Sequence, residues 1–382
     1  MEFTEQFETG DLFASYFITS KPHLVLGYIS RKLLYSISVL FGIVTVVFLL
    51  FTALPGDPAR LMLGQRADQS EVEMIRKDLG LDLPLLTQYL VYLNDLSPLS
   101  FYNHANTESP YFFEPTEHES SIFLSQGQTT NVILKAPYLR RSYQSQQPVV
   151  QIVSDALPGT AVLAVTAILI ATILGITFGI FGALFKGQWL DKLLMVFSIF
   201  GMSLPSFVAA ILIMWVFAYL LGSVTGLEVT GSLYEIDEFE GKRLVLKNLI
   251  LPAITLGVRP LAVFMQLTRN SMLDVLSMDY VRTATAKGLS FQTVVVKHAL
   301  RNALNPVITA ISGWLASLLA GAVFVEIVFG WKGLGLIMLN ALNTYDLPVV
   351  MGCIILVAVI FVVINMLVDV LYGIFDPRVS LN

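Results

Sequence analysis

The sequence predicts an all-α integral membrane protein with six transmembrane helices and both termini on the cytoplasmic side. Of its 382 residues, 55% are hydrophobic and 13% are charged, whereas soluble domains carry roughly a quarter charged residues. The mean hydropathy is +0.72. Six apolar runs are long enough to cross a bilayer as helices, since a span needs about 20 residues. They cover residues 33–54, 159–184, 191–221, 250–272, 307–330 and 348–373.

The charged residues are sorted between the two sides of the predicted membrane, although the net charge is only −5. Basic residues gather before the first run, around Lys186 and Lys192, and in the loop between the fourth and fifth runs. The 222–249 loop instead holds five acidic and three basic residues. Because Lys and Arg accumulate in short cytoplasmic loops, this distribution places both termini in the cytoplasm.

Residues 1–30 form a cytoplasmic N-terminal extension with an amphipathic pattern. The extension either lies on the membrane surface or is disordered, and the sequence favours neither interpretation. The apolar run that follows is longer than a signal-peptide core and has no small-residue cleavage site after it, so we interpret it as a retained anchor. A Pro-Gly-Asp-Pro string at 55–58 ends that helix.

A large extracytoplasmic loop completes the second part of the chain, residues 31–156. The periodicity of residues 70–95 predicts helix. The stretch from about 96 to 147 is rich in Ser, Asn, Gln, Pro and aromatic residues. It is either a small cap over the outer mouth or a surface whose aromatic residues contact a partner. The remaining residues, 157–382, form a core of five helices.

Polar residues inside the predicted spans are candidates for function, because ionisable groups are costly in a bilayer. Ser203 and Pro205 interrupt the third span, where a proline frees a carbonyl and permits a kink. Arg259 in the fourth span and Glu326 in the fifth are candidates for lining a translocation path. All four residues are therefore predicted to line or bend a pore.

Two polar residues in the last span predict a structural contact instead. Asn365 and Asp369 are four residues apart, so they share one helix face. We expect them to clamp two helices together, with Arg269 or Arg282 as an available partner. On the second span, the small residues Gly175, Gly179 and Gly182 are spaced for close helix packing.

The most informative polar stretch is residues 279–306, with the sequence DYVRTATAKGLSFQTVVVKHALRNALNP. Its pattern predicts a short helix at 280–287, a break at Gly288 and a second helix at 291–304. Small side chains at 283–286 give the first helix a slim surface that another protein can approach closely. The loop is therefore predicted to dock a soluble partner on the cytoplasmic side.

The motif DYVRTAxAKG, followed by HALRNAL and a proline, resembles the coupling loop of ABC-importer permeases of the dipeptide/oligopeptide branch. The resemblance implies a type I ABC-importer permease fold, MetI-like, with a coupling loop at 274–306. Arg282 stands where the wider importer pattern has glutamate, a departure that the peptide branch shares. The residues implied to couple to an ATPase are Asp279, Tyr280, Arg282, Thr283, Ala284, Ala286, Lys287 and Gly288.

The resemblance covers most of the chain. It includes LPGDPA after the first span, GMSLPSF in the third and DPR near the end. It leaves out the extreme N-terminus and the 96–147 stretch, which is an insertion where the family has a short link. Lys332 stands where the family commonly has proline, which leaves the detail of that outer turn open.

The resemblance also implies a machine of several subunits in the bacterial cytoplasmic (inner) membrane. Its other parts are a second homologous permease, two cytoplasmic ABC ATPases that use ATP and Mg, and an extracytoplasmic binding protein or lipoprotein. The cargo implied is di- or oligopeptides moved inward. Related permeases carry nickel complexes, glutathione or glycosides, and the sequence does not separate these cargoes.

Other classes of function are less compatible with the sequence. It has no G-x-x-x-x-G-K-[ST] loop, so we do not expect the chain to bind ATP. Its four histidines lie outside the spans and Cys353 is its one cysteine, so we expect neither a metal site nor enzyme activity. Membrane topology explains the basic loop better than nucleic-acid binding does. A secondary transporter would usually show internal repeats. A membrane scaffold or sensor would dock a partner without stimulating its ATPase in response to cargo.

Overall fold

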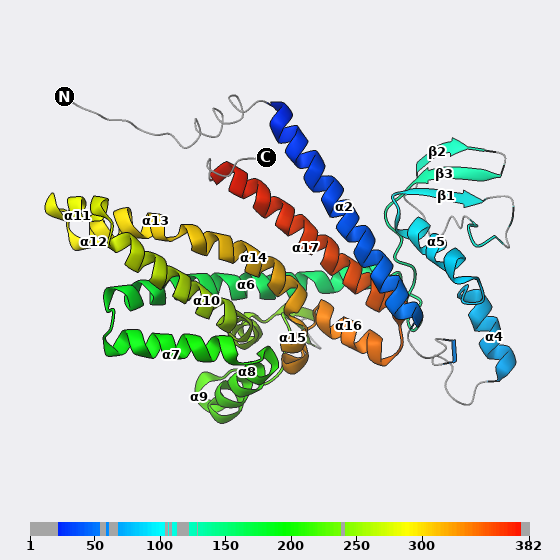
Figure 1. The fold of residues 1–382 in the computed structure, drawn as a ribbon. Coiled ribbons are helices and arrows are strands. Elements are labelled where there is room, and N and C mark those ends of the chain that lie inside the picture. Colours follow the sequence, from blue (N-terminus) through cyan, green and yellow to red (C-terminus); the bar gives the residue numbers. More distant parts are fainter. Residues whose placement is uncertain are drawn as a thin grey trace.

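The computed structural model describes residues 22–53, 59–60, 68–103, 106, 109–112, 122–127, 129–237 and 241–375. Helices dominate and form an elongated bundle (Figure 1). Among the described residues, four helices are long and apolar enough to cross a membrane without a break. They are α2 (Pro22–Ala53), α6 (Val149–Leu184), α10 (Ile250–Leu276) and α17 (Leu347–Phe375).

Two further predicted spans are present as broken helices. The third turns by 115° between α7 (Trp189–Ser203) and α8 (Ser206–Ile213), which continues into the π-helical η2 (Met214–Leu220). The fifth divides into α14 (Asn305–Gly321) and α15 (Val323–Phe329). The six predicted runs therefore all coincide with helices.

The sequence pattern did not predict the sharp bend that follows α15. An 83° bend leads into α16 (Leu334–Asn343) before α17 begins. Gly330 lies at the bend with a φ of +62°, a left-handed conformation that glycine adopts without steric cost. The remaining short elements on this side are α9 (Gly222–Thr225), the hairpin of β4 (Tyr234–Asp237) and β5 (Gly241–Leu244), and η3 (Leu246–Leu249).

Helices α6 and α10 pack against each other through glycines. A methyl group on Gly179 would lie 2.4 Å from Cβ of Thr268, and one on Gly175 would lie 2.8 Å from Cβ of Phe264. Small residues let membrane helices approach this closely, and packing then supplies the attraction that the apolar solvent does not. The close packing predicted from the glycine spacing is confirmed.

Replacing Gly179 with leucine is expected to separate α6 from α10 and to lower the yield of folded protein at least fivefold. Overpacking alone typically costs about 1–3 kcal/mol, and here Thr268 and the Met265 carbonyl leave no space for a side chain. Gly313→Leu on α14 is the control, since nothing lies within 4 Å of a Cβ there. Monodisperse yield on gel filtration is the measurement. Equal yields for the two variants would contradict the packing argument.

The outer loop contains strands that the all-α prediction did not include. After α4 (Gln69–Asp78) and α5 (Leu85–Leu96), three antiparallel strands pair in the order β1-β3-β2. They are β1 (Leu99–Asn103), β2 (Ile122–Gln126) and β3 (Thr130–Leu134). This sheet lies at the opposite end of the molecule from α11 and α12, the helices of the 279–306 loop (Figure 1). The strands thus lie outside the membrane-spanning bundle.

The last part of the predicted insertion is tied to its surroundings. The Arg140 guanidinium lies 3.0 Å from the buried Asp95 carboxylate at the end of α5. Lys135 donates to the backbone carbonyl of Asp95, and burial lowers the pKa of this lysine to about 8 despite the nearby Asp95 charge. Ser142 and the backbone N–H of Tyr143 both donate to Asp346, which lies between α16 and α17. Residues 135–147 therefore hold the outer loop to the bundle.

We expect a narrower segment, 104–129, to be replaceable without loss of assembly. Asn103 and Thr130 are paired neighbours at the ends of β1 and β3, so an Asn-Gly turn can join them as a hairpin. Replacing 97–146 instead removes Arg140 and Ser142 and leaves two buried carboxylates without these partners, which is destabilising. Co-purification of the partner subunits measures assembly. Equal assembly of the two replacements would contradict this boundary.

Candidate functional site

The 279–306 loop is a folded unit with a small apolar core of its own. Its first helix, α11 (Asp279–Ala286), buries Val281 and Ala284, which are 4% and 6% exposed. They pack with Val294 and Val295 of the π-helical η4 (Val294–Leu300). The amphipathic spacing of α11 explains this contact, since residues three apart lie on one helix face. The loop is thus held in a fixed shape.

The apolar core of the loop also includes the inner ends of two spans. Ala183 of α6 and both Met272 and Val275 of α10 belong to the same buried cluster as Val281. Close-packed interiors transmit displacement because they contain few voids. A force applied to the loop therefore acts directly on α6 and α10.

The turn between the two loop helices depends on Gly288, which has a φ of +80°. No atom lies within 4 Å of the position that a Cβ would take, so backbone conformation and not internal crowding requires glycine here. Ser290 follows and caps α12 (Phe291–Thr293) by accepting a hydrogen bond from the Thr293 N–H. The sharp turn leaves the tip of the loop open to solvent.

A hydrogen bond between side chains joins the first loop helix to the end of the second. The Asn302 amide on α13 (Arg301–Ala303) donates to the Tyr280 hydroxyl at 2.8 Å. Tyr280 is 39% exposed. Tyr280 therefore contributes to the shape of the loop as well as to its surface.

The exposed surface of the loop combines cations with apolar side chains. The side chain of Arg282 is 73% exposed and forms a long, 3.6 Å pair with Asp279, while Lys287 is also exposed. Phe291 is 67% exposed and Val296 is 59% exposed. Exposed apolar residues ringed by charged groups are typical of protein contact surfaces. The sequence pattern identified Phe291 only as the start of a helix. The feature that could have indicated its exposure is its position as an aromatic residue just after the glycine turn.

One expectation about this surface is wrong. Ala284 was expected to face a partner, but it is buried in the core of the loop. Thr283 and Ala286 on the same helix are exposed. Helical geometry explains the difference, because one face of α11 must cover Val294 and Val295.

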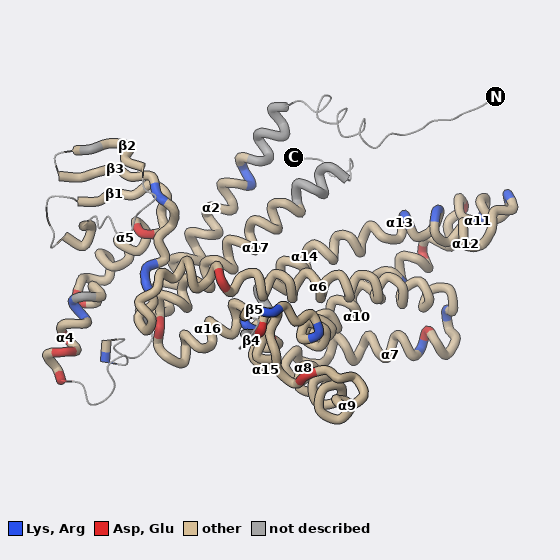
Figure 2. The backbone as a smooth tube through the Cα atoms, turned by 180° about the vertical axis from the view of Figure 1, so that it is seen from behind, with Lys and Arg blue, Asp and Glu red and all other residues tan. Residues whose placement is uncertain are grey.

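Figure 2 shows the Lys and Arg residues of the α6–α7 turn and of α11 to α13 at the same end of the molecule. Within this end, the Arg269 guanidinium of α10 forms two hydrogen bonds with the Asp191 carboxylate of α7, at 2.6 and 2.8 Å. The sequence had offered Arg269 as a partner for the clamp in the last span. The sequence signal for the true partner was Asp191, an acidic residue in the first turn of the apolar helix α7.

The remaining polar candidates lie in separate places. Ser203 and Pro205 flank the 115° bend of the third span. Arg259 is exposed on α10. The Asn365 amide donates to the Phe361 carbonyl of its own helix, and the side chain of Asp369 lies outside the described residues. Their roles in the pore and in a helix clamp stay predictions.

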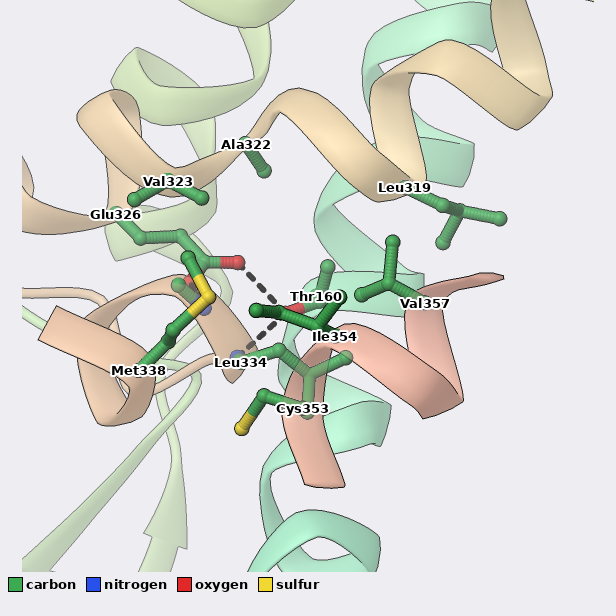
Figure 3. A pocket seen from close by; sticks show the side chains of 11 residues that line it. Thr160, Leu319, Ala322, Val323, Glu326, Leu334, Met338, Cys353, Ile354 and Val357 are labelled. Carbon is green, nitrogen blue, oxygen red and sulfur yellow. Dashed lines mark hydrogen bonds between the residues drawn. The ribbon is translucent and has the colours of Figure 1, made fainter. Parts of the chain in front are cut away.

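Glu326 joins three helices around a cavity of about 160 Å³ (Figure 3). One carboxylate oxygen accepts from the Thr160 hydroxyl of α6 at 2.6 Å. The other accepts from the backbone N–H groups of Gly335 and Leu336 at 2.7 and 3.2 Å. These amides begin α16, where a negative charge is stabilised by the helix N-terminus. Glu326 is fully buried within this chain, and its proposed place on a translocation path stays a prediction.

The structure thus combines apolar helices long enough to cross a membrane with a folded, exposed loop at the end where Lys and Arg residues gather. A family model for the binding-protein-dependent transport system inner membrane component matches residues 175–381. A second model, for the N-terminal part of such membrane components, matches residues 25–115.

Individual relatives agree with this match. A dipeptide transport system permease of Alkalihalophilus pseudofirmus is 34% identical over 93% of this chain and 100% of its own length. A glutathione transport system permease of Escherichia coli is 35% identical over 93% of this chain and 99% of its own length. A di/tripeptide transport system permease of Pseudomonas aeruginosa is 35% identical with the same two coverages.

A solved structure, the inward-facing methionine ABC transporter MetNI, is 15% identical and covers 58% of this chain and 96% of its own chain with a TM-score of 0.42. The sequence matches establish the assignment without it. The chain belongs to the family of binding-protein-dependent transport system inner membrane components, the permease subunits of ABC importers.

Proposed function

We propose that this permease moves small peptides inward across a bacterial cytoplasmic membrane. It would pair with a second permease and dock one of two cytoplasmic ABC ATPases, which use ATP and Mg. An extracytoplasmic binding protein would deliver the cargo. The observation that carries the proposal is the rigid loop at 279–306, which shares its apolar core with α6 and α10 and exposes Phe291 at its tip.

The packing of the loop supports a direct mechanism. ATP binding would close the ATPase pair and move the two docked loops together. Since Val281 packs with Met272 and Val275 of α10, this movement would tilt α10 and the α6 helix that is locked to it through Gly179. The bundle would then open outward to accept cargo, and hydrolysis would reverse the movement.

Peptide cargo is supported by the names of relatives that match nearly the whole chain, which carry dipeptides, di/tripeptides or glutathione. The test uses the complete transporter in proteoliposomes, with its binding protein, and compares uptake of a dipeptide, glutathione and a nickel complex. We expect ATP-dependent uptake of the dipeptide and stimulation of the ATPase by the loaded binding protein. Uptake without ATP would favour a secondary transporter, and transport of nickel alone would exclude the peptide assignment.

A further inference from the structure

One face of helix α10 carries three polar residues, with the apolar Val263 among them. Arg259, Val263, Gln266 and Asn270 follow a spacing of four, three and four residues, which puts them on one helix face. Arg259 and Asn270 are exposed, and Val263 and Gln266 are partly exposed. At about 1.5 Å per residue, Arg259 lies roughly 13 Å along the helix from Ile250. This is within the depth of a hydrocarbon core of roughly 30 Å.

The other sides of α10 are covered by this chain. Within the Leu246–Leu276 span, 72% of the most apolar window is buried, against 33% for α6 and for α17. On one side of α10, helix α6 packs closely through Gly175 and Gly179. On another side, Ser198 of α7 donates to the Ala262 carbonyl and accepts from the Gln266 amide. Of the face that carries the polar residues, Arg259 and Asn270 therefore remain exposed.

Arg259 differs from the second arginine of the same helix. Arg269 is neutralised by Asp191, whereas no ion pair or hydrogen bond to Arg259 occurs among the residues that the structure describes. An arginine at this depth is costly against lipid tails, and such residues almost always face the interior of the bundle, a water-filled cavity or a paired anion. Its planar fork of donors fits a carboxylate in a bidentate arrangement.

We propose that Arg259 faces the aqueous translocation path and binds the carboxylate of the passing peptide. The inference rests on the proposed function, because every unmodified peptide carries a C-terminal carboxylate. Arg259 supplies a fixed positive charge on the exposed part of this face, and so its charge complements that terminus; Gln266 and Asn270 follow about two and three turns further along the same face. Arg259 thereby selects cargo with a free carboxyl end.

The first test measures access of water to position 259. Because Cys353 is the one cysteine of the chain, C353A gives a background in which R259C is the single thiol. We expect a charged, membrane-impermeant thiol reagent to label R259C in the complete transporter. L169C is the control, since Leu169 is 55% exposed on the apolar surface of α6 and should stay unlabelled. Labelling of R259C no greater than that of L169C would overturn the proposal.

The second test compares uptake of a dipeptide with that of its C-terminal amide, using wild type, R259M and R259K. Comparing variants removes the selectivity of the binding protein, which is the same in all three. We expect R259M to lower the ratio of acid to amide uptake at least tenfold, and R259K to lower it less than threefold. For the acid alone, R259M should keep less than a tenth of wild-type uptake and R259K more than a third.

The outcomes separate this inference from the proposed function. If the wild type imports the dipeptide but R259M lowers acid and amide uptake equally, or R259K is as poor as R259M, Arg259 has a structural role and the inference fails alone. If the wild type imports no peptide, the proposed function and this inference fail together.

Discussion

Replacing Gly288 with valine is expected to lower ATP-driven uptake at least tenfold while leaving the protein inserted and paired with the second permease. The φ of +80° at Gly288 is strained for a β-branched residue, by about 1–3 kcal/mol. A side chain there meets nothing inside the chain, so it would project into the space that a docked ATPase needs. The expected defect is therefore one of coupling and not of folding.

Gly187→Val is the matched control for this prediction. Gly187 lies in the α6–α7 turn at the same end of the bundle, has a φ of +79° and has no atom within 4 Å of a Cβ position. The Gly187→Val variant introduces the same backbone strain outside the loop and should retain most of the wild-type uptake. Uptake in proteoliposomes and ATPase stimulation by the loaded binding protein are the measurements. Equal losses in the two variants would show that strain and not docking explains the effect.

Replacing Glu326 with leucine is expected to prevent α15 and α16 from packing against α6. The change removes the acceptors of the Thr160 hydroxyl and of the Gly335 and Leu336 amides. Each buried donor left without an acceptor costs about 1–3 kcal/mol, so the loss is on the order of several kcal/mol. Gly333 and Gly335 pack directly on the carboxylate, and leucine is too short to fill the place of its oxygens. We expect little folded protein from this variant.

Glu326→Gln is a milder substitution at the same position, and its stability is compared with that of Glu326→Leu. One amide oxygen still accepts from the α16 backbone, and the amide N–H can donate to Thr160, so this variant should fold with a moderately lower Tm. Thermal unfolding of the purified transporter measures the difference. Equal Tm values for wild type and Glu326→Leu would contradict the role given to the carboxylate, and would favour a pore-lining role instead.

The sequence predicted those features that depend on local composition. Each of the six apolar runs falls on a helix, because length and hydropathy alone decide whether a segment can span a bilayer. The glycine turn of the loop was predictable for the same reason, since residue type at Gly288 encodes the backbone conformation. The spacing of Gly175 and Gly179 indicated close helix packing, but it did not specify which helix packs against them.

The features that the sequence missed depend on contacts between distant residues. Glu326 meets Thr160 across 166 positions of the chain, and nothing near Glu326 indicates that partner. The pairing of β1 with β3 joins strands separated by a long polar stretch, where alternation is too weak to predict a strand. The burial of Ala284 depends on how α11 rotates onto Val294 and Val295, which small side chains alone do not specify.

The central claim is that the 279–306 loop docks an ATPase, and cross-linking from Phe291 tests it most directly. A photoreactive phenylalanine analogue at position 291, which is 67% exposed, should form an adduct with the ATPase subunit in the complete transporter. The same analogue at Phe101, which is 54% exposed on β1 at the opposite end, should form none. An ATPase adduct from position 101, or none from position 291 in an assembled and active transporter, would contradict the claim.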